Sequence, residues 1–154
     1  MKHLLIAILV LILPACKTLK QQQSNDDIEL KNLIEYILIE FFDANEEICL
    51  INQSISFDFK FPSTFKGGDT NLSIEERTLI EERFKGNPIK WKDIIQSEYI
   101  SKGYNCLRIS EPIIIRNGRI AFVYKSQAGS EFYDIYENAG KGWKLKENII
   151  TILN

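Results

Sequence analysis

The feature that most restricts the fold is a series of short β-type segments in the last third of the chain. From Tyr104 onward, apolar and aromatic residues recur in runs separated by turn-forming residues. Asn117-Gly118 predicts a hairpin with a type I′ turn, because both central positions of that turn need positive φ. The segment NAGKG, residues 138–142, marks another turn. Connections this short join antiparallel neighbours, so we predict a meander of about four strands, drawn from the segments NCLRIS, PIIIR, RIAFVYK, EFYDIYE and WKLKENII.

Aromatic residues recur along one face of this predicted meander. The periodicity of the strands accounts for them as core residues, and that is the interpretation we favour. The alternative is that they line a ligand-binding cleft. The residues concerned are Phe122, Tyr124, Phe132, Tyr136 and Trp143.

Two helices are predicted before the meander. Residues 28–42 carry apolar side chains at helical spacing, and their polar face is acidic rather than rich in Lys and Arg. This favours packing on a core over lying on a membrane surface. Ser73 and Glu76 form a capping box for a second helix over residues 74–85, which Gly86 ends. Two helices and an antiparallel sheet indicate a single α+β domain over residues 28–154.

The segment between these two helices shows a different period. Apolar residues alternate with polar ones, which predicts a strand with one buried aromatic face that ends at Pro62. After the second helix, Pro88 opens a stretch in which we expect one or two more helical turns. The alternating apolar residues are Ile55, Phe57, Phe59 and Phe61.

The loop before the second helix has some of the spacing of a calcium-binding loop. Asp69, Asn71 and Ser73 lie at alternate positions, but Ile74 stands where such a loop needs Gly and Ile80 stands where it needs Glu. We therefore expect no metal ion and no other cofactor.

Catalytic chemistry is restricted by the lack of histidine. The one histidine, His3, lies in the leader described below. Without it, imidazole-dependent nucleophilic sites and histidine-based zinc or copper centres are excluded. Asp58 and Asp134 remain as a carboxylate pair that a hydrolase could use, if the fold brought them together. We expect a protein that is not an enzyme.

The acidic residues of the second predicted helix do not look like a catalytic pair. They are interleaved with Arg77 and Arg83, so we interpret them as a solvated, partly paired face. The residues are Glu75, Glu76, Glu81 and Glu82.

Cys49 and Cys106 are the two cysteines that follow Cys16. In an exported chain, an even pair is compatible with a disulfide, so we predict that the two lie within bonding reach. The alternative is two buried thiols, since free cysteine is among the most buried residue types.

Residues 1–15 have the pattern of a secretory signal peptide. A short basic start is followed by an unbroken apolar run from Leu4 to Leu13 and by a small residue, Ala15. The run is about half of the ~20 residues that a spanning helix needs.

The stretch Leu13-Pro14-Ala15-Cys16 resembles the lipobox of bacterial lipoprotein precursors, with Pro14 a less usual occupant of its position. The resemblance implies cleavage before Cys16 and acylation of its thiol, so the mature protein would be anchored to the membrane through lipid on Cys16. Residues 16–27 would then form the lipidated cysteine and a flexible tether. Lys17 follows Cys16 instead of an Asp that would retain a lipoprotein at the inner membrane. This implies an outer-membrane location, and we expect the domain to face the periplasm.

Charge and composition restrict the partner further. The chain has 19 basic and 21 acidic residues, and loss of Lys2 with the leader would give a formal net charge of −3. This balance gives no reason to expect nucleic acid. Our first hypothesis is a non-enzymatic envelope lipoprotein that binds a partner protein or has a structural role, including that of an inhibitor or immunity protein.

The second hypothesis is a small-molecule-binding domain with an aromatic pocket. The order of elements, helices first and a curved meander last, resembles small cone-shaped folds of the nuclear-transport-factor-2 type. That resemblance implies a fold that could enclose such a pocket.

Overall fold

A computed structural model describes residues 27–42, 47–61, 65–103 and 105–153. The predicted leader, Cys16 and most of the predicted tether lie outside these residues. The described chain is an α+β domain in which a mostly antiparallel sheet separates two clusters of buried side chains. Among the described residues, no helix is both long and apolar enough to cross a membrane.

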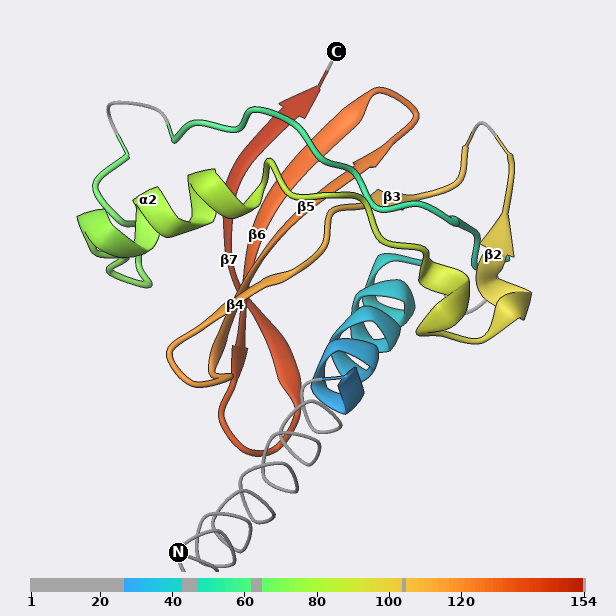
Figure 1. The fold of residues 1–154 in the computed structure, drawn as a ribbon, viewed down its shortest axis with the longest axis horizontal. Helices are drawn as coiled ribbons and strands as arrows, with labels where there is room; N and C mark the ends of the chain where they lie inside the picture. Colours follow the sequence, from blue (N-terminus) through green and yellow to red (C-terminus); the bar gives the residue numbers. More distant parts are fainter. Residues whose placement is uncertain (1–26, 43–46, 62–64, 104, 154) are drawn as a thin grey trace, which may run out of the picture.

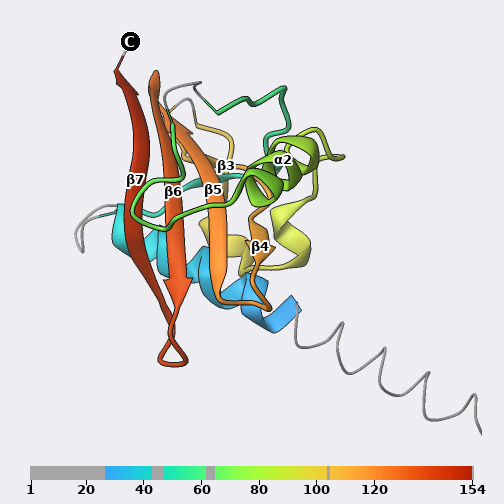
Figure 2. The same cartoon turned by 90° about the vertical axis from the view of Figure 1, so that its left-hand side faces the viewer.

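The predicted meander is confirmed. Strands β5, β6 and β7 are consecutive antiparallel neighbours, and two shorter strands pair with different halves of β5. Figure 2 shows the long strands side by side, with the N-terminal helix crossing behind them. The strands are β3 (Arg108–Ile109), β4 (Ile113–Ile115), β5 (Ile120–Gln127), β6 (Ser130–Asn138) and β7 (Trp143–Leu153).

The N-terminal helix, described over residues 27–41, covers one face of the sheet (Figures 1 and 2). Its apolar stripe packs against β5, β6 and the beginning of β7, which confirms the predicted amphipathic helix. The buried contacts on this face include Leu33, Ile34, Ile37, Leu38, Ala121, Val123, Tyr136 and Trp143.

The second helix, α2 (Ile74–Arg83), packs on the opposite face of the sheet through Ile80. The predicted capping box is present: the Ser73 hydroxyl accepts from the backbone N–H of Glu76, and the Glu76 carboxylate accepts from the N–H of Ser73. The helix ends at Arg83, two residues earlier than predicted. Phe84 follows as the C-cap and is buried in the same cluster.

The prediction of a strand over residues 55–61 is wrong. Apart from an isolated bridge between Ile55 and Ser110, this segment forms no ladder. The N–H of Phe57 donates instead to the carbonyl of Phe84, and the N–H of Phe61 donates to the carboxylate of Glu81. These bonds hold the segment across the C-terminal end of α2. Its aromatic side chains nevertheless pack in the core. The alternation of apolar and polar residues indicates which side chains are buried, and it does not show that the backbone pairs with another strand.

Short elements connect the helices to the sheet. Strand β1 (Leu50–Ile51) pairs in parallel with β2 (Ile100–Ser101). The helical turns expected after Pro88 are the 3₁₀ helices η1 (Trp91–Asp93) and η2 (Ser97–Tyr99). Trp91 is fully buried under the N-terminal helix, so this stretch completes the core of that face.

The hairpin signal at Asn117-Gly118 is confirmed, but its turn differs from the prediction. Ile115 pairs with Ile120, so the loop has four residues, and Arg116 has positive φ together with Asn117 and Gly118. A two-residue turn with positive φ at both positions occurs instead between β5 and β6, at Ala128 and Gly129. The wider β4–β5 loop directs arginine side chains to one end of the sheet.

Candidate functional site

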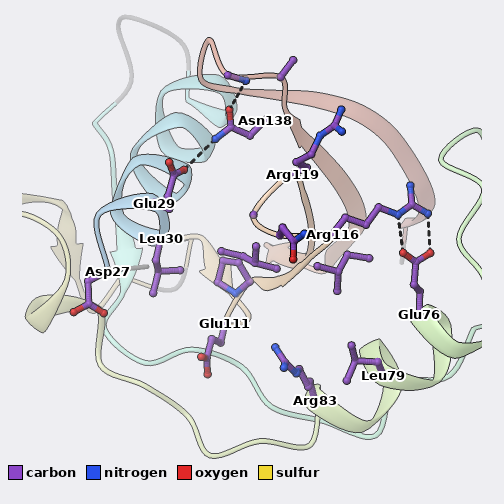
Figure 3. A pocket seen from close by; sticks show the side chains of 17 residues that line it. Asp27, Glu29, Leu30, Glu76, Leu79, Arg83, Glu111, Arg116, Arg119 and Asn138 are labelled. Atoms are coloured by element: carbon purple, nitrogen blue, oxygen red, sulfur yellow. Dashed lines mark hydrogen bonds and ion pairs between the residues drawn. The ribbon is translucent and has the colours of Figure 1, made fainter. Parts of the chain in front are cut away.

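An open groove of about 1420 Å³ lies at the end of the sheet where the described chain begins. It is bounded by the first turn of the N-terminal helix, by α2, by the β4–β5 hairpin and by the turn after β6. Figure 3 shows its side chains converging from these four elements. Segments far apart in the sequence therefore form one concave surface.

The floor of the groove is apolar. Leu30 comes from the N-terminal helix, Leu79 from the outer side of α2, and Pro112, Ile114 and Ile115 from β4 and its approach. Leu79 is an apolar residue that is 37% exposed, whereas the next residue, Ile80, is fully buried against the sheet. Partly exposed apolar side chains between polar walls are typical of binding sites.

One wall of the groove is basic. Arg116 is fixed there, because its guanidinium donates to both carboxylate oxygens of Glu76 at 2.6 and 2.7 Å and to the carbonyls of Thr70 and Asn71 (Figure 3). The guanidinium of Arg116 holds the pKa of Glu76 below its usual value. Glu76 thus joins the capping box to the wall of the groove.

Two further arginines of the groove are not neutralised. Arg83 at the end of α2 and Arg119 at the end of the β4–β5 loop are both exposed and both line the groove. In the described part of the chain, neither side chain has an ion-pair partner. Arg83 was predicted to lie on a partly paired face of the helix, whereas the structure leaves it facing the groove (Figure 3).

The opposite wall is acidic. Glu29 accepts a hydrogen bond of 3.0 Å from the side-chain amide of Asn138, which joins the N-terminal helix to the turn after β6 (Figure 3). Asp27 and Glu111 contribute two more carboxylates to the lining. The groove therefore presents opposite charges on its two sides, with an apolar strip between them.

The four glutamates of α2 do not form a catalytic pair. Glu76 binds Arg116, Glu81 accepts from Lys60 at 2.7 Å, and Glu75 accepts from the Ser73 hydroxyl at 2.8 Å. The hydrogen bond from Lys60 lowers the pKa of Glu81. A partly paired face was predicted, but the basic partners come from other segments and not from the helix itself.

Asp58 and Asp134 are not brought together. Asp58 is exposed and pairs with Lys85 at 2.9 Å, in the segment that packs against α2. Asp134 is 1% exposed and contacts Lys125 and Tyr136 on the face covered by the N-terminal helix. The pairing that a two-carboxylate hydrolase would need is absent for these two residues.

The loop that resembled a calcium loop is occupied by a side chain from β7. The N–H groups of Asp69 and Thr70 both donate to the carboxylate of Glu147, at 3.1 and 3.0 Å. Gly68 has φ 61°, which favours glycine, and a Cβ there would also lie 1.9 Å from a Glu147 oxygen. Within the described ranges, no group of three or more His, Cys, Asp or Glu side chains could hold a metal ion.

Cys49 and Cys106 are joined by a disulfide, with Cα atoms 4.9 Å apart. Cys49 precedes β1 and Cys106 precedes β3, and the N–H of Leu107 donates to the carbonyl of Cys49 at 3.0 Å. The bond therefore joins the β1 segment to the edge of the main sheet. Cys16, the predicted lipidation site, lies outside the described residues.

The aromatic residues fill the core and do not line the groove. Phe57 packs on Tyr124 with ring centroids 4.7 Å apart, and Phe59 packs on Tyr133 at 5.0 Å. Burial raises the pKa of Tyr133 to about 12. The core interpretation of the aromatic pattern therefore holds, but the prediction of a single aromatic face is wrong. Phe122 and Tyr124 lie in the cluster beside α2, whereas Tyr136 and Trp143 lie in the cluster under the N-terminal helix.

A buried polar network between β5, β6 and the N-terminal helix was missed by the sequence analysis. Lys125 is 5% exposed, and its ammonium group contacts Asp134 and donates to the Tyr136 hydroxyl at 2.9 Å. Asn148 donates to the other Asp134 oxygen at 2.6 Å. The only sequence signal was a lysine and an aspartate at inward positions of two apolar strands, a pattern that a solvated edge would also produce.

Comparisons of the chain with protein-family profiles, with curated protein sequences and with solved structures find no match.

Proposed function

We propose that this protein is a lipid-anchored envelope lipoprotein whose groove binds an extended segment of a partner protein. The observation that carries the proposal is the pair of unneutralised arginines, Arg83 and Arg119, beside an apolar floor. Charged groups left open next to apolar surface favour a ligand that supplies both carboxylates and apolar side chains.

The dimensions and charges favour a polypeptide over other ligands. Small-molecule pockets usually enclose about 300–1,000 Å³, whereas this open groove is larger, at about 1420 Å³. The carboxylates of Asp27, Glu29 and Glu111 on the acidic wall would repel a nucleic acid or an anionic headgroup. A protein segment can match an acidic wall and a basic wall at once.

The anchor would hold the groove close to the membrane. Asp27 lines the groove and lies only 11 residues after Cys16. Even fully extended, 11 residues span at most ~40 Å. The proposal therefore predicts a partner that is itself at the envelope, facing the periplasm from the outer membrane.

The second hypothesis, an aromatic small-molecule pocket, has no comparable support. The aromatic residues that motivated it are divided between the two core clusters or pack against them, and the lining of the groove includes none of them. We therefore retain the partner-binding role alone.

The test removes two positive charges from the groove and, in a matched control, two from elsewhere. The double variant Arg83→Gln/Arg119→Gln should reduce recovery of the envelope partner by at least tenfold, because each charge-assisted hydrogen bond contributes ~1.5–3 kcal/mol. The control Lys92→Gln/Lys102→Gln changes the net charge equally at exposed positions outside the groove. Equal loss in both variants would contradict the groove as the binding site.

The anchor is tested separately. Fatty-acid labelling of cells should mark the wild-type protein, and Cys16→Ser should abolish both the label and membrane association. Labelling that persists in Cys16→Ser would remove the lipoprotein proposal and leave the groove proposal intact.

A further inference from the structure

The buried pair Lys125 and Asp134 has a geometry that the partner-binding role does not use. The two residues lie on adjacent antiparallel strands, with Val123 opposite Asp134 and Lys125 two positions further along the same face. The ammonium nitrogen is 2.5 Å from Asp134 Oδ2, and the side chains are only 6% and 2% exposed. A nitrogen this close to a carboxyl oxygen lies roughly 3–4 Å from the carboxyl carbon, which is near the separation of reacting atoms in a near-attack geometry.

The surrounding residues hold both groups in place and exclude water. The rings of Phe41, Phe132 and Tyr136 lie 5.1, 5.9 and 5.6 Å from the Lys125 nitrogen. Asn148 binds the Asp134 oxygen that faces away from Lys125, at 2.6 Å. The Asp134 carboxyl group is thereby held by Lys125 on one oxygen and by Asn148 on the other, in a site where both reacting side chains are buried.

Proton-transfer groups adjoin the pair. The Tyr136 hydroxyl accepts from the Lys125 ammonium at 2.9 Å and donates to Asp134 at 3.2 Å, so it touches both reacting groups. The carboxyl group of Glu40, at the end of the N-terminal helix, hydrogen-bonds with the same hydroxyl. Partial burial raises the pKa of Glu40, so this carboxyl group is protonated more often than that of an ordinary exposed glutamate.

We propose that Lys125 and Asp134 form an intramolecular isopeptide bond that covalently joins β5 to β6. The ammonium first passes a proton to the carboxylate through the Tyr136 hydroxyl, which gives an amine and a carboxylic acid. The amine nitrogen attacks the carboxyl carbon, a C–N bond forms, and the C–O bond to one oxygen breaks. That oxygen leaves as water with two of the three ammonium protons. The reaction is balanced and needs no oxidant, reductant or cofactor.

Burial favours this course over a lasting ion pair. Two buried charges carry a desolvation cost that a neutral amide does not, and the released water can leave for the solvent. Tyr136 acts directly on the reacting groups, whereas Glu40 is a positioning residue that acts through Tyr136. The exposed pair Lys85–Asp58 offers a comparison within the same chain, since its side chains are 51% and 70% exposed and remain solvated.

Peptide mass spectrometry of the reduced protein tests the proposal without any variant. A protease that cuts after glutamate cleaves at Glu131, between the two residues, so the cross-linked chain yields one branched fragment that is lighter than the sum of two by one water. Lys85 and Asp58 should appear in unlinked fragments. Two separate, unmodified fragments containing Lys125 and Asp134 would overturn the proposal.

Variants test the chemistry. Asp134→Asn should give the same branched fragment with loss of ammonia instead of water, and Lys125→Arg should give none. Glu40→Gln should lower the linked fraction at least tenfold, while the control Glu35→Gln, on the same helix but paired with Lys31, leaves it unchanged. Equal linked fractions in both glutamine variants would remove Glu40 from the reaction, and a branched fragment in Lys125→Arg would overturn the assignment of the bond. These results are independent of partner binding.

Discussion

Removal of the Cys49–Cys106 disulfide should lower the stability of the domain by several kcal/mol. The perturbation is the double variant Cys49→Ala/Cys106→Ala, in which alanine avoids a buried hydroxyl at Cys106, a residue only 3% exposed. The two cysteines are 57 residues apart in the sequence. Loop-closure entropy for a loop of that length corresponds to about 4 kcal/mol at 25 °C.

The fold explains why this value should be reached. The disulfide joins the β1 segment to β3, and both partners are already held by backbone hydrogen bonds, including Leu107 N–H to Cys49 and Ile51 N–H to Leu107. The folded backbone therefore holds the two cysteines close together without help from the disulfide. The disulfide then stabilises the domain mainly by restricting the unfolded chain. In a domain of this size the loss corresponds to a fall in Tm of roughly 10–20 °C.

Urea unfolding, followed by tryptophan fluorescence, measures the change. The oxidised wild type should be about 4 kcal/mol more stable than the double alanine variant. Reductant should bring the wild type to the level of the variant and leave the variant itself unchanged. A difference below ~1 kcal/mol would refute the loop-entropy reasoning for this bond.

Three further predictions concern a turn, a charge pair and a loop. Ala128→Asn should stabilise the domain by ~0.5–1 kcal/mol in thermal melts, because Ala128 has φ 49° and asparagine tolerates that region better. The control Ala139→Asn should not stabilise the domain. Glu76→Gln should cost ~1 kcal/mol at pH 7 in urea unfolding. Arg116 lowers the folded-state pKa of Glu76 from 4.5, so the stabilisation is present above pH 4.5 and should disappear as the pH falls through the lowered pKa. If Glu76→Gln lowered the free energy of unfolding equally at pH 3 and pH 7, the result would count against the pair. Melts of the mature domain with and without a chelator should coincide, since Glu147 already occupies the 69–70 loop, and a loss of several degrees would argue for a bound ion.

The sequence predicted the elements with strong periodicity or a specific cap. The capping box at Ser73 and Glu76, the amphipathic N-terminal helix and the antiparallel meander depend on local patterns that tertiary structure did not override. The segment 55–61 shows the limit of such patterns. Its alternation correctly marked Phe57, Phe59 and Phe61 as residues that pack in the core. Whether the segment pairs as a strand depends on which distant groups its backbone meets, here Phe84 and Glu81 of the α2 region, and the sequence does not reveal that.

The functional surfaces could not be predicted, because they depend on contacts between distant segments. Arg83 and Arg119 are ordinary exposed arginines until the fold brings both to the same groove, Arg83 beside Leu79 and Arg119 beside Asn138. Likewise, the strand register brings Lys125 and Asp134 together, and the N-terminal helix covers the face of the sheet on which they lie. Neither arrangement produces a motif with fixed spacing.

Site-specific photo-crosslinking in living cells is the most direct test of the proposed groove. A photoreactive amino acid at Leu79, on the floor of the groove, should capture one envelope protein through an extended segment of that protein, identified by mass spectrometry. The same probe at Lys102, outside the groove, should not capture it, and Arg83→Gln/Arg119→Gln should weaken the capture at Leu79. Equal capture at Leu79 and Lys102, or capture at Leu79 that is unaffected by loss of the two arginines, would contradict the groove as a binding site for a polypeptide.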